Sequence, residues 1–268
     1  MEFYKENTFF SIEQHTGNNL SNDEHFHDMF EFYYLKEGKA TYFVNGKIYN
    51  LVKGDIVVIP PNTLHKTIFS KETRRKRILF YLDKRFISID TQGQTILPEV
   101  PVFSGGTDRV KEIFEEMLIE FNTSNSSIYL NALICELLIL LERIDTSTFS
   151  SQEDNDLPKI ITDVLDYIAL NYSADLSLKS IAEKFYLNSS YLSRLFKKHT
   201  GFTFCNYLMQ YRIKEANKLL AQSGKKVTEV ALECGFNSSN NFCKCYKKLT
   251  GTTPLSYRKH ILCRNKQM

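Results

Sequence analysis

Two stretches in the second half of the chain combine side chains that hydrogen-bond to nucleic-acid bases with lysines that bind phosphates. When the apolar residues of 189–199 turn inward, the exposed side chains are Ser190, Tyr191, Ser193, Arg194 and Lys197, followed by Lys198. In 238–249 they are Ser239, Asn240, Asn241, Cys243 and Lys244, followed by Lys247 and Lys248. Arginine pairs bidentately with guanine, and asparagine with adenine. The pattern predicts DNA recognition; the alternative is a polar, solvated face on an ordinary helical bundle.

A second group of candidate residues lies near the start of the chain. His25, His27 and Glu31 occupy odd-numbered positions, so they share one face of an extended strand, and His65 follows further on. Three histidines and one carboxylate suit a divalent metal ion, which makes His25, His27, Glu31 and His65 a candidate metal site. The same side chains could instead hydrogen-bond one another or an organic effector, with Tyr33 as a wall of that effector site. Both interpretations stay open.

The two DNA-reading stretches belong to an internal repeat, in which Ile181-Ala182 is answered by Val230-Ala231. Each copy is a short helix, a tight turn and a longer helix that begins with asparagine or serine, which are preferred N-caps. This order predicts two helix-turn-helix units. Between them, Phe204 to Leu220 predicts a helix of about 18 residues, which is about 27 Å long and comparable to the roughly 34 Å between successive major-groove faces of DNA.

The region from about 160 to 259 resembles the DNA-binding domain of AraC/XylS-type transcriptional regulators. The resemblance implies two helix-turn-helix units in adjacent major grooves and activation of transcription by contact with RNA polymerase. We add Arg212, in the helix between the units, to the candidate DNA-binding residues. The second unit departs from the family at Lys244, where arginine is more usual. The motifs that match are Leu178-x-x-Ile181-Ala182, Tyr191-Leu192-Ser193-Arg194-Leu195-Phe196-Lys197-Lys198-x-Thr200-Gly201, Arg212-Ile213-x-x-Ala216-x-x-Leu219-Leu220, Val230-Ala231-x-x-x-Gly235-Phe236 and Thr250-Gly251-x-x-Pro254-x-x-Tyr257-Arg258.

The histidine spacing near the start of the chain resembles the two cupin motifs. Regulators of the AraC/XylS type commonly have a cupin-like sensor domain without metal. The resemblance therefore implies an effector-binding barrel ahead of the DNA-binding domain. The matching stretches are His25-x-His27-x-x-x-Glu31-x6-Gly38 and Gly54-x5-Pro60-x-Asn62-x-x-His65, with Asn62 where glycine is usual and no glycine before His25.

The expected fold is α+β in two domains. Short strand patterns over about 3–86 predict a cupin-like β-barrel, including a hairpin at Asn45-Gly46. With helices over about 108–145, the barrel forms an effector-sensing and dimerisation domain, residues 1–145. Residues 146–157 form a polar linker, and 158–268 form the all-α domain. The helix at about 128–144 is apolar on nearly every face, so it packs on the barrel or on its copy in a homodimer.

Charge separates the same two halves. Residues 1–156 hold 16 Lys+Arg against 24 Asp+Glu, which gives −8, whereas 157–268 hold 18 against 7, which gives +11. The basic half is suited to a polyanion. No apolar stretch approaches the roughly 20 residues that cross a bilayer, and no secretion signal is evident, so we expect a cytoplasmic protein without a membrane partner. The six cysteines show no zinc-site spacing and are read as reduced thiols.

Two function classes fit these observations. The first is a ligand-responsive transcription regulator that binds double-stranded DNA, RNA polymerase and a small effector. The second is a metal-dependent cupin enzyme with an accessory helical half. The basic tandem repeat favours the regulator, because an enzyme needs no pair of groove-reading helices, so we expect a chain without catalytic activity.

Overall fold

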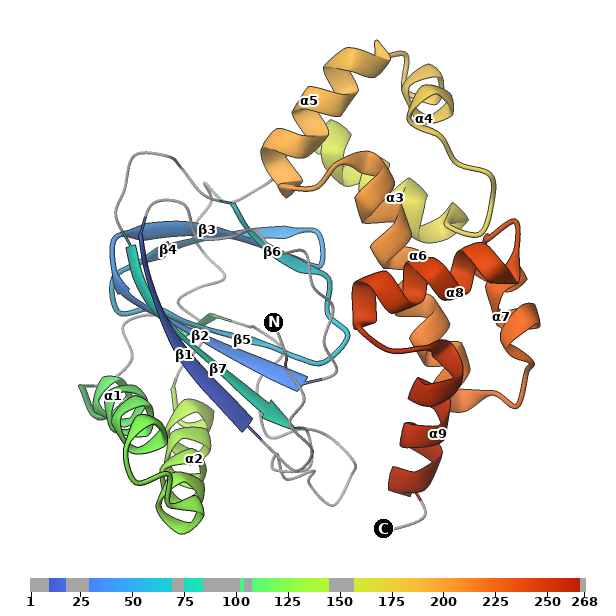
Figure 1. Cartoon of the computed structure of the whole chain (residues 1–268). Coiled ribbons are helices and arrows are strands. Elements are labelled where there is room, and N and C mark those ends of the chain that lie inside the picture. The colour runs from blue at the N-terminus through green and yellow to red at the C-terminus, as the bar shows by residue number, and fades with distance from the viewer. Residues whose placement is uncertain are drawn as a thin grey trace.

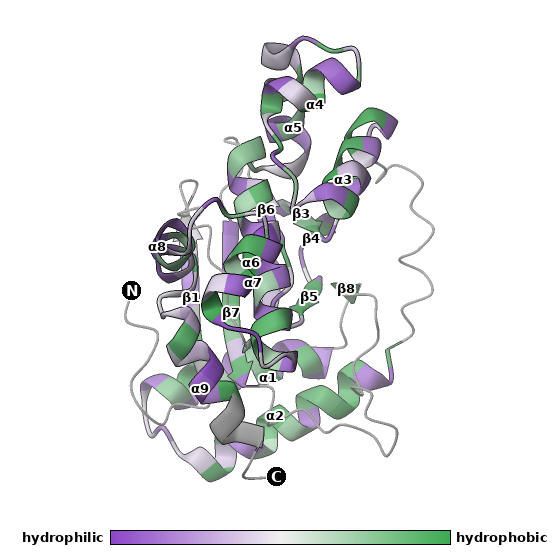
Figure 2. Ribbon diagram, turned by 90° about the vertical axis from the view of Figure 1, so that its right-hand side faces the viewer, coloured by the Kyte–Doolittle hydropathy of each residue, from purple (hydrophilic) through white to green (hydrophobic). Residues whose placement is uncertain are grey.

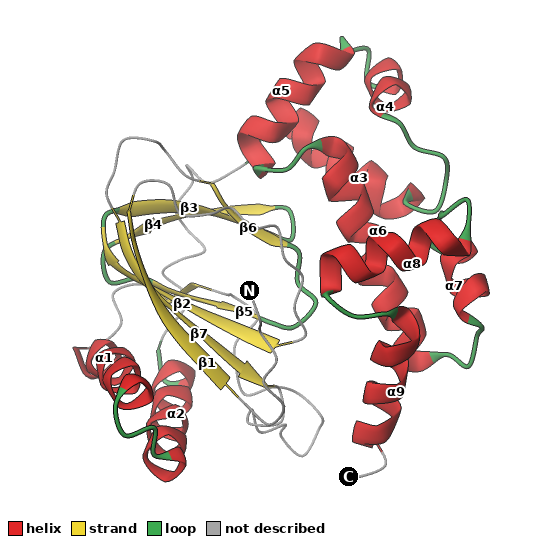
Figure 3. Ribbon diagram, viewed as in Figure 1, coloured by secondary structure: helices red, strands yellow, loops and turns green. Residues whose placement is uncertain are grey.

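The computed structural model describes residues 10–17, 29–68, 75–83, 102–103, 108–144 and 157–265. Strands come first and helices follow, so the sheet-rich and helical parts are separate along the chain (Figures 1 and 3). This confirms the predicted α+β class. The predicted linker 146–157 lies almost wholly outside the described residues. The strands are β1 (Phe10–Gly17), β2 (Met29–Glu37), β3 (Lys39–Val44), β4 (Lys47–Val52), β5 (Ile56–Ile59), β6 (His65–Ile68), β7 (Arg75–Asp83) and β8 (Val102–Phe103).

The strands form two sheets that face one another. One sheet has the strand order β1-β7-β2-β5-β8 and the other has the order β4-β3-β6. Within the described residues no strand pairing joins the two sheets, so the closed barrel expected from the sequence is not observed there. The hairpin between β3 and β4 is confirmed, because Asn45 and Gly46 both have positive φ, 46° and 86°, and Val44 pairs with Lys47.

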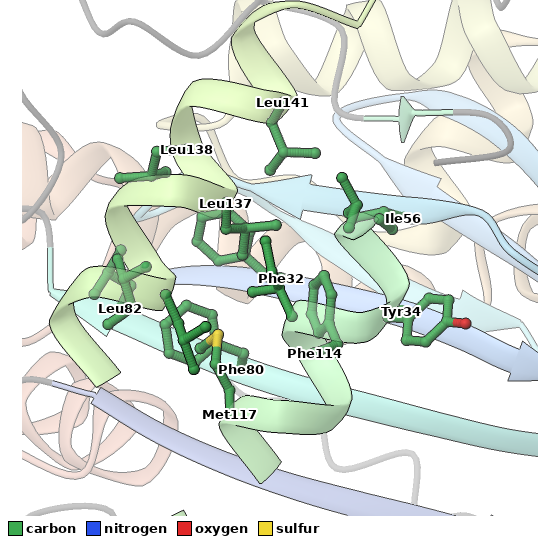
Figure 4. Close-up of a cluster of buried hydrophobic side chains, with 14 of the residues drawn as sticks. Phe32, Tyr34, Ile56, Phe80, Leu82, Phe114, Met117, Leu137, Leu138 and Leu141 are labelled. Carbon is green, nitrogen blue, oxygen red and sulfur yellow. The ribbon is translucent and has the colours of Figure 1, made fainter. Parts of the chain in front are cut away.

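Successive side chains of each strand in the larger sheet point to opposite faces of the sheet, and each face packs on a different layer. One face packs on α1 (Asp108–Asn122) and α2 (Ser127–Glu142), where Phe32 and Phe80 meet Phe114 and Leu137 (Figure 4). One side of α2 is therefore covered within the chain, and its buried residues are Leu130, Leu133, Ile134, Leu137, Leu138 and Leu141. Across the two helices, Arg109 donates to Glu136 at 2.8 Å.

The other face of the larger sheet points toward the smaller one. We call the side chains between the two sheets the inter-sheet layer. Its apolar members are Tyr33, Leu35, Val57, Ile59, Leu79, Tyr81 and Val102 from the larger sheet, and Ala40, Tyr42, Val44 and Leu51 from the smaller.

Seven helices make up the described C-terminal half, in the positions predicted from the 3.6-residue periodicity and the N-caps. Asn188 accepts hydrogen bonds from the backbone N–H groups of Ser190 and Tyr191, and Ser238 caps the equivalent helix of the second unit. Gly201 ends the first of these helices in the left-handed region, with φ 77°. The helices are α3 (Lys159–Asn171), α4 (Leu178–Lys184), α5 (Ser189–Thr200), α6 (Phe204–Gln222), α7 (Val227–Glu233), α8 (Ser239–Thr250) and α9 (Pro254–Asn265).

Candidate DNA-binding surface and effector site

Helix α5 places the candidate readers of the first unit on its solvent side. Leu192 and Phe196 are fully buried against the core of the helical half, which fixes the rotation of the helix. Every polar candidate of this helix is exposed: Ser190, Tyr191, Ser193, Arg194, Lys197 and Lys198. The structure therefore brings these six side chains onto one accessible face, with the lysines in the last turn.

Helix α8 repeats this arrangement in the second unit. Phe242 and Tyr246 are fully buried and anchor the helix, while Cys243 is half-buried beside that core. Ser239 is also half-buried, and the remaining candidates are exposed: Asn240, Asn241, Lys244, Lys247 and Lys248. In Figure 2 the ribbon of α8 is coloured largely for hydrophilic residues, whereas the ribbon of α2 is coloured mainly for hydrophobic ones.

Arg212 lies on α6 and hydrogen-bonds to the backbone of the helical half. Its Nε donates to the carbonyl oxygen of Tyr172, and its second terminal nitrogen donates to that of Ala174, both at 2.8 Å. Burial lowers the pKa of this guanidinium group. Since the side chain ties α6 to the turn after α3, we leave it out of the proposed DNA contacts.

Two members of the predicted effector site face one another in the inter-sheet layer. Glu31 is only 2% exposed and accepts a hydrogen bond from the Tyr42 hydroxyl at 2.9 Å. His65 Nε2 lies 3.5 Å from the other oxygen of Glu31. The Nδ1 of His65 is 2.8 Å from the carbonyl oxygen of Thr63, which can only accept, so Nδ1 carries a hydrogen. Burial and the charge of Glu31 raise the pKa of Tyr42 well above its ordinary value.

His25 and His27 lie outside the described residues. Among the residues that are described, no three His, Cys, Asp or Glu side chains lie close enough to hold a metal ion. Glu31 and His65 do bring a carboxylate oxygen and an imidazole nitrogen together, which fits half of the predicted set. The four-residue metal site therefore stays a prediction.

Tyr33 lies in the same layer, as its position on the strand face of Glu31 predicts, and it is fully buried. Two arginines that the sequence analysis did not select also belong to the interior of this domain. Arg75 is 0% exposed and Arg77 is 7% exposed, and the Arg77 guanidinium carbon lies 5.7 Å from the Tyr33 ring centre. A sequence signal existed, because Arg75 and Arg77 share a strand face with the inward-facing Leu79 and Tyr81.

The outer face of the smaller sheet contacts the helical half (Figure 1). Phe43, on β3, meets the ring of Phe202 at 5.9 Å and that of Tyr207 at 6.1 Å, in edge-to-face geometry. On β6, Lys66 places its Nζ 4.9 Å from the centre of the Phe202 ring. An apolar contact thus joins the smaller sheet to the turn between α5 and α6 and to α6 itself.

Polar contacts continue this interface along α6. Lys214 donates to Asn45 at 3.3 Å, and Asn217 Nδ2 donates to Asn62 Oδ1 at 2.7 Å. The Tyr246 hydroxyl, from α8, donates to Asn217 Oδ1. Asn217 is therefore a bridge between the loop after β5 and α8, the longer helix of the second unit.

Known families match both halves of the chain. Residues 9–138 match an AraC-like ligand binding domain, and residues 181–260 match a helix-turn-helix domain. None of the described helices is long and apolar enough to cross a membrane.

Relatives of known type align over nearly the whole chain. The HTH-type transcriptional activator RhaS of Pectobacterium carotovorum is 26% identical over 251 residues, which is 90% of this chain and 89% of RhaS. The Msm operon regulatory protein of Streptococcus mutans is 25% identical over 243 residues, 87% of this chain and 85% of the relative. Among solved structures, the DNA-binding domain of AdpA in complex with a target DNA is 25% identical, covers 40% of this chain and 97% of that domain, and has a TM-score of 0.39.

Proposed function

Because the chain belongs to the AraC family of DNA-binding transcription regulators, we propose that it activates transcription under the control of a small effector held in the inter-sheet layer. The effector site comprises Glu31, Tyr33 and His65, with His25 and His27 as further candidates. The alternative of a cupin enzyme is set aside, because the full-length relatives are transcription regulators.

The observation that carries this proposal is the double role of the smaller sheet. On β3, Tyr42 and Val44 point into the inter-sheet layer, while Phe43 between them packs against the helical half. On β6, the side chain of His65 reaches Glu31, while Lys66 lies over Phe202. Neighbouring residues of a strand point to opposite faces, so an effector that shifts either strand also shifts the contact with α6.

A series of polar contacts also connects the loop before His65 to α8. Asn62 lies three residues before His65 in the loop between β5 and β6, and it contacts Asn217. Asn217 in turn holds Tyr246 on the buried side of α8. A displacement of His65 is thereby passed to a helix that reads DNA.

We further propose that α5 and α8 enter adjacent major grooves. Arg194, Asn240 and Asn241 are the leading candidates for base contacts, because their exposed groups match the edges of guanine and adenine. Ser190, Tyr191, Ser193, Ser239, Cys243 and Lys244 complete the reading faces. The lysines of the last turns bind phosphates: Lys197, Lys198, Lys247 and Lys248. Activation then proceeds by contact with RNA polymerase, in the cytoplasm where the chromosome lies.

The outer side of α2 supports the proposed homodimer. Ile128, Ala132, Cys135 and Ile139 are exposed and recur at intervals of four, three and four residues, so they form one stripe along the helix. Such a stripe is suited to pack against its own copy in a two-fold interface.

The experiment begins with a genome-wide map of the DNA bound in cells, which we expect to show discrete sites. Fluorescence polarisation then measures the affinity of the full chain for one such site, in the presence and absence of a small-molecule extract of the cells used for the map. Phe43→Ala should weaken the effector-dependent change while leaving effector binding in place. Phe121→Ala, which removes an aromatic ring from the α1–α2 side of the domain, is the control and should keep the response. An undiminished response in Phe43→Ala would count against coupling through the smaller sheet.

A further inference from the structure

The two helix-turn-helix units end their longer helices in the same way. Gly201 follows α5 and Gly251 follows α8, and both lie in the left-handed region, with φ 77° and 75°. In each unit the preceding threonine, Thr200 or Thr250, donates its hydroxyl to a carbonyl oxygen one turn earlier. Such a cap is set by the local sequence. A difference between the surroundings of the two glycines therefore comes from the rest of the chain.

The surroundings of the two glycines do differ. A Cβ atom on Gly201 would lie 3.1 Å from Cδ of Lys66 and 3.2 Å from Cγ1 of Ile68, whereas a Cβ atom on Gly251 would have no heavy atom of the described residues within 4 Å. Lys66 and Ile68 are two residues apart on β6, so they share one face of that strand. Strand β6 therefore lies directly against the end of α5, and no described residue covers the equivalent end of α8.

The next residue of each unit shows the same asymmetry. Phe202 is fully buried, while Thr252, at the equivalent position, is half-buried. The Phe202 ring meets the ring of Phe43 from β3, and the Nζ of Lys66 lies over its other contacts at 4.9 Å from the ring centre. Because packed interiors deform little, a buried aromatic ring in this place fixes the turn after α5 relative to the smaller sheet.

The apolar cores of the two units differ accordingly. Phe43 and Leu64, from the sheet-rich half, belong to the same cluster as Phe196, which anchors α5. The cluster that anchors α8 draws its described buried members from residues 213–261. The sheet-rich half reaches α8 in another way, through the two hydrogen bonds of Asn217. That link meets α8 on its buried side and not at its capping glycine.

We propose that β6 positions the longer helix of the first unit on DNA. Lys66 and Ile68 hold the end of α5 that carries Lys197 and Lys198, and the second unit has no such support among the described residues. The alignment of α5 with its groove thus depends on the sheet-rich half, whereas that of α8 depends mainly on the helical half. This inference rests on the proposed reading of DNA by α5 and α8.

The test measures which half of a DNA site responds when this support is weakened in the full chain. Ile68→Ala removes the contact from the sheet side and leaves both helix-turn-helix units unchanged in sequence. Val52→Ala, at a 49% exposed position on β4 of the same sheet, is the control. The probes are one site from the genome-wide map, the same site with its α5 half scrambled, and the same site with its α8 half scrambled. Loss of base preference in Arg194→Ala identifies the α5 half.

A positioning role predicts a loss of affinity that is confined to one half of the site. Ile68→Ala should bind the intact site about 5- to 100-fold more weakly than the wild-type chain, the range expected for the loss of one base contact. The same loss should appear when only the α5 half is kept, and it should vanish when only the α8 half is kept. A merely structural defect would instead lower the affinity for all three probes by one factor, because it reduces the folded fraction. Val52→Ala should match the wild-type chain on every probe.

Two glycine substitutions examine the same contact from the helical side. Gly201→Ala and Gly251→Ala impose similar backbone strain, since both glycines have positive φ, 77° and 75°. Only Gly201→Ala also places a methyl group against Lys66 and Ile68. It should therefore weaken binding to the α5 half by a larger factor than Gly251→Ala weakens binding to the α8 half. Should Gly201→Ala fail to fold, Ile68→Ala decides the question.

The inference is overturned if Ile68→Ala binds all three probes as the wild-type chain does, if it loses the same factor on all three, or if its loss follows the α8 half. Equal losses for the two glycine variants would also count against it. If scrambling either half leaves the affinity of the wild-type chain unchanged, the proposed DNA reading fails as well. If the wild-type chain needs both halves and Ile68→Ala behaves as Val52→Ala does, the proposed function stands and only the positioning by β6 fails.

Discussion

Replacing Asn217 by alanine tests the bridge between the two halves of the chain. The Asn217 amide makes two hydrogen bonds at once, one to Asn62 of the sheet-rich half and one with Tyr246 of α8. A net contribution of about 1 kcal/mol per hydrogen bond gives an expected loss of about 2 kcal/mol in the free energy of unfolding of the helical half. Asn62→Ala and Tyr246→Phe each remove one of the two bonds, so each should cost about 1 kcal/mol.

Urea unfolding followed by far-ultraviolet circular dichroism measures these losses, since the helical half contributes most of that signal. Asn206→Ala, at an exposed position of the same helix, is the control and should change stability by less than about 0.5 kcal/mol. The two single losses should add up to that of Asn217→Ala. The bridge would be refuted if Asn217→Ala lowered the free energy of unfolding no more than Asn206→Ala does. It would also be refuted if Tyr246→Phe lowered that free energy while Asn62→Ala left it unchanged.

Three further predictions concern base reading, pH and assembly. Arg194→Ala should lower the binding free energy for the preferred base by about 1 to 3 kcal/mol at one base pair and relax the preference there. Lys198→Ala should instead lower the affinity for all DNA sequences alike. Binding to a panel of single-base variants of the site distinguishes the two outcomes. Burial raises the pKa of Tyr33 from 10.0 to about 12, so the folded state favours the neutral phenol. This difference contributes up to about 2.7 kcal/mol to the free energy of unfolding. The contribution is fully present below pH 10 and is lost as the pH rises to 12. Unfolding of Tyr33→Phe across that range should show a shallower decline than the wild-type chain, and identical slopes would argue against it. Ile139→Lys, on the exposed stripe of α2, should shift the full chain toward monomer in sedimentation, and an unchanged dimer would remove that stripe from the interface.

Local sequence signals predicted the helical half well. The seven helices follow from apolar periodicity and from caps such as Asn188 and Ser238, which act within a few residues. The Asn45-Gly46 turn was equally readable, because both positions need positive φ. The exposed faces of α5 and α8 were also predictable, because the positions of the apolar residues show which side of each helix is buried.

Interactions between distant parts of the chain were harder to predict. The strand β6 reads His65-Lys66-Thr67-Ile68 and is too short and polar to stand out, yet one of its faces is covered by the helical half. Phe43 and Phe202 lie far apart in sequence, and no periodicity indicates that they meet. Arg212 was a candidate DNA-binding residue in the helix between the units, but its guanidinium group donates to carbonyl oxygens about 40 residues earlier in the chain.

The most direct test of the central claim is a chemical footprint of the full chain on a DNA site recovered from cells. If α5 and α8 read adjacent major grooves, protection should fall in two major-groove segments on one face of the duplex, with centres about 10 base pairs apart. Arg194→Ala should remove protection from one segment, and a double Asn240→Ala, Asn241→Ala variant from the other. A single protected segment, or protection confined to the minor groove, would contradict the account.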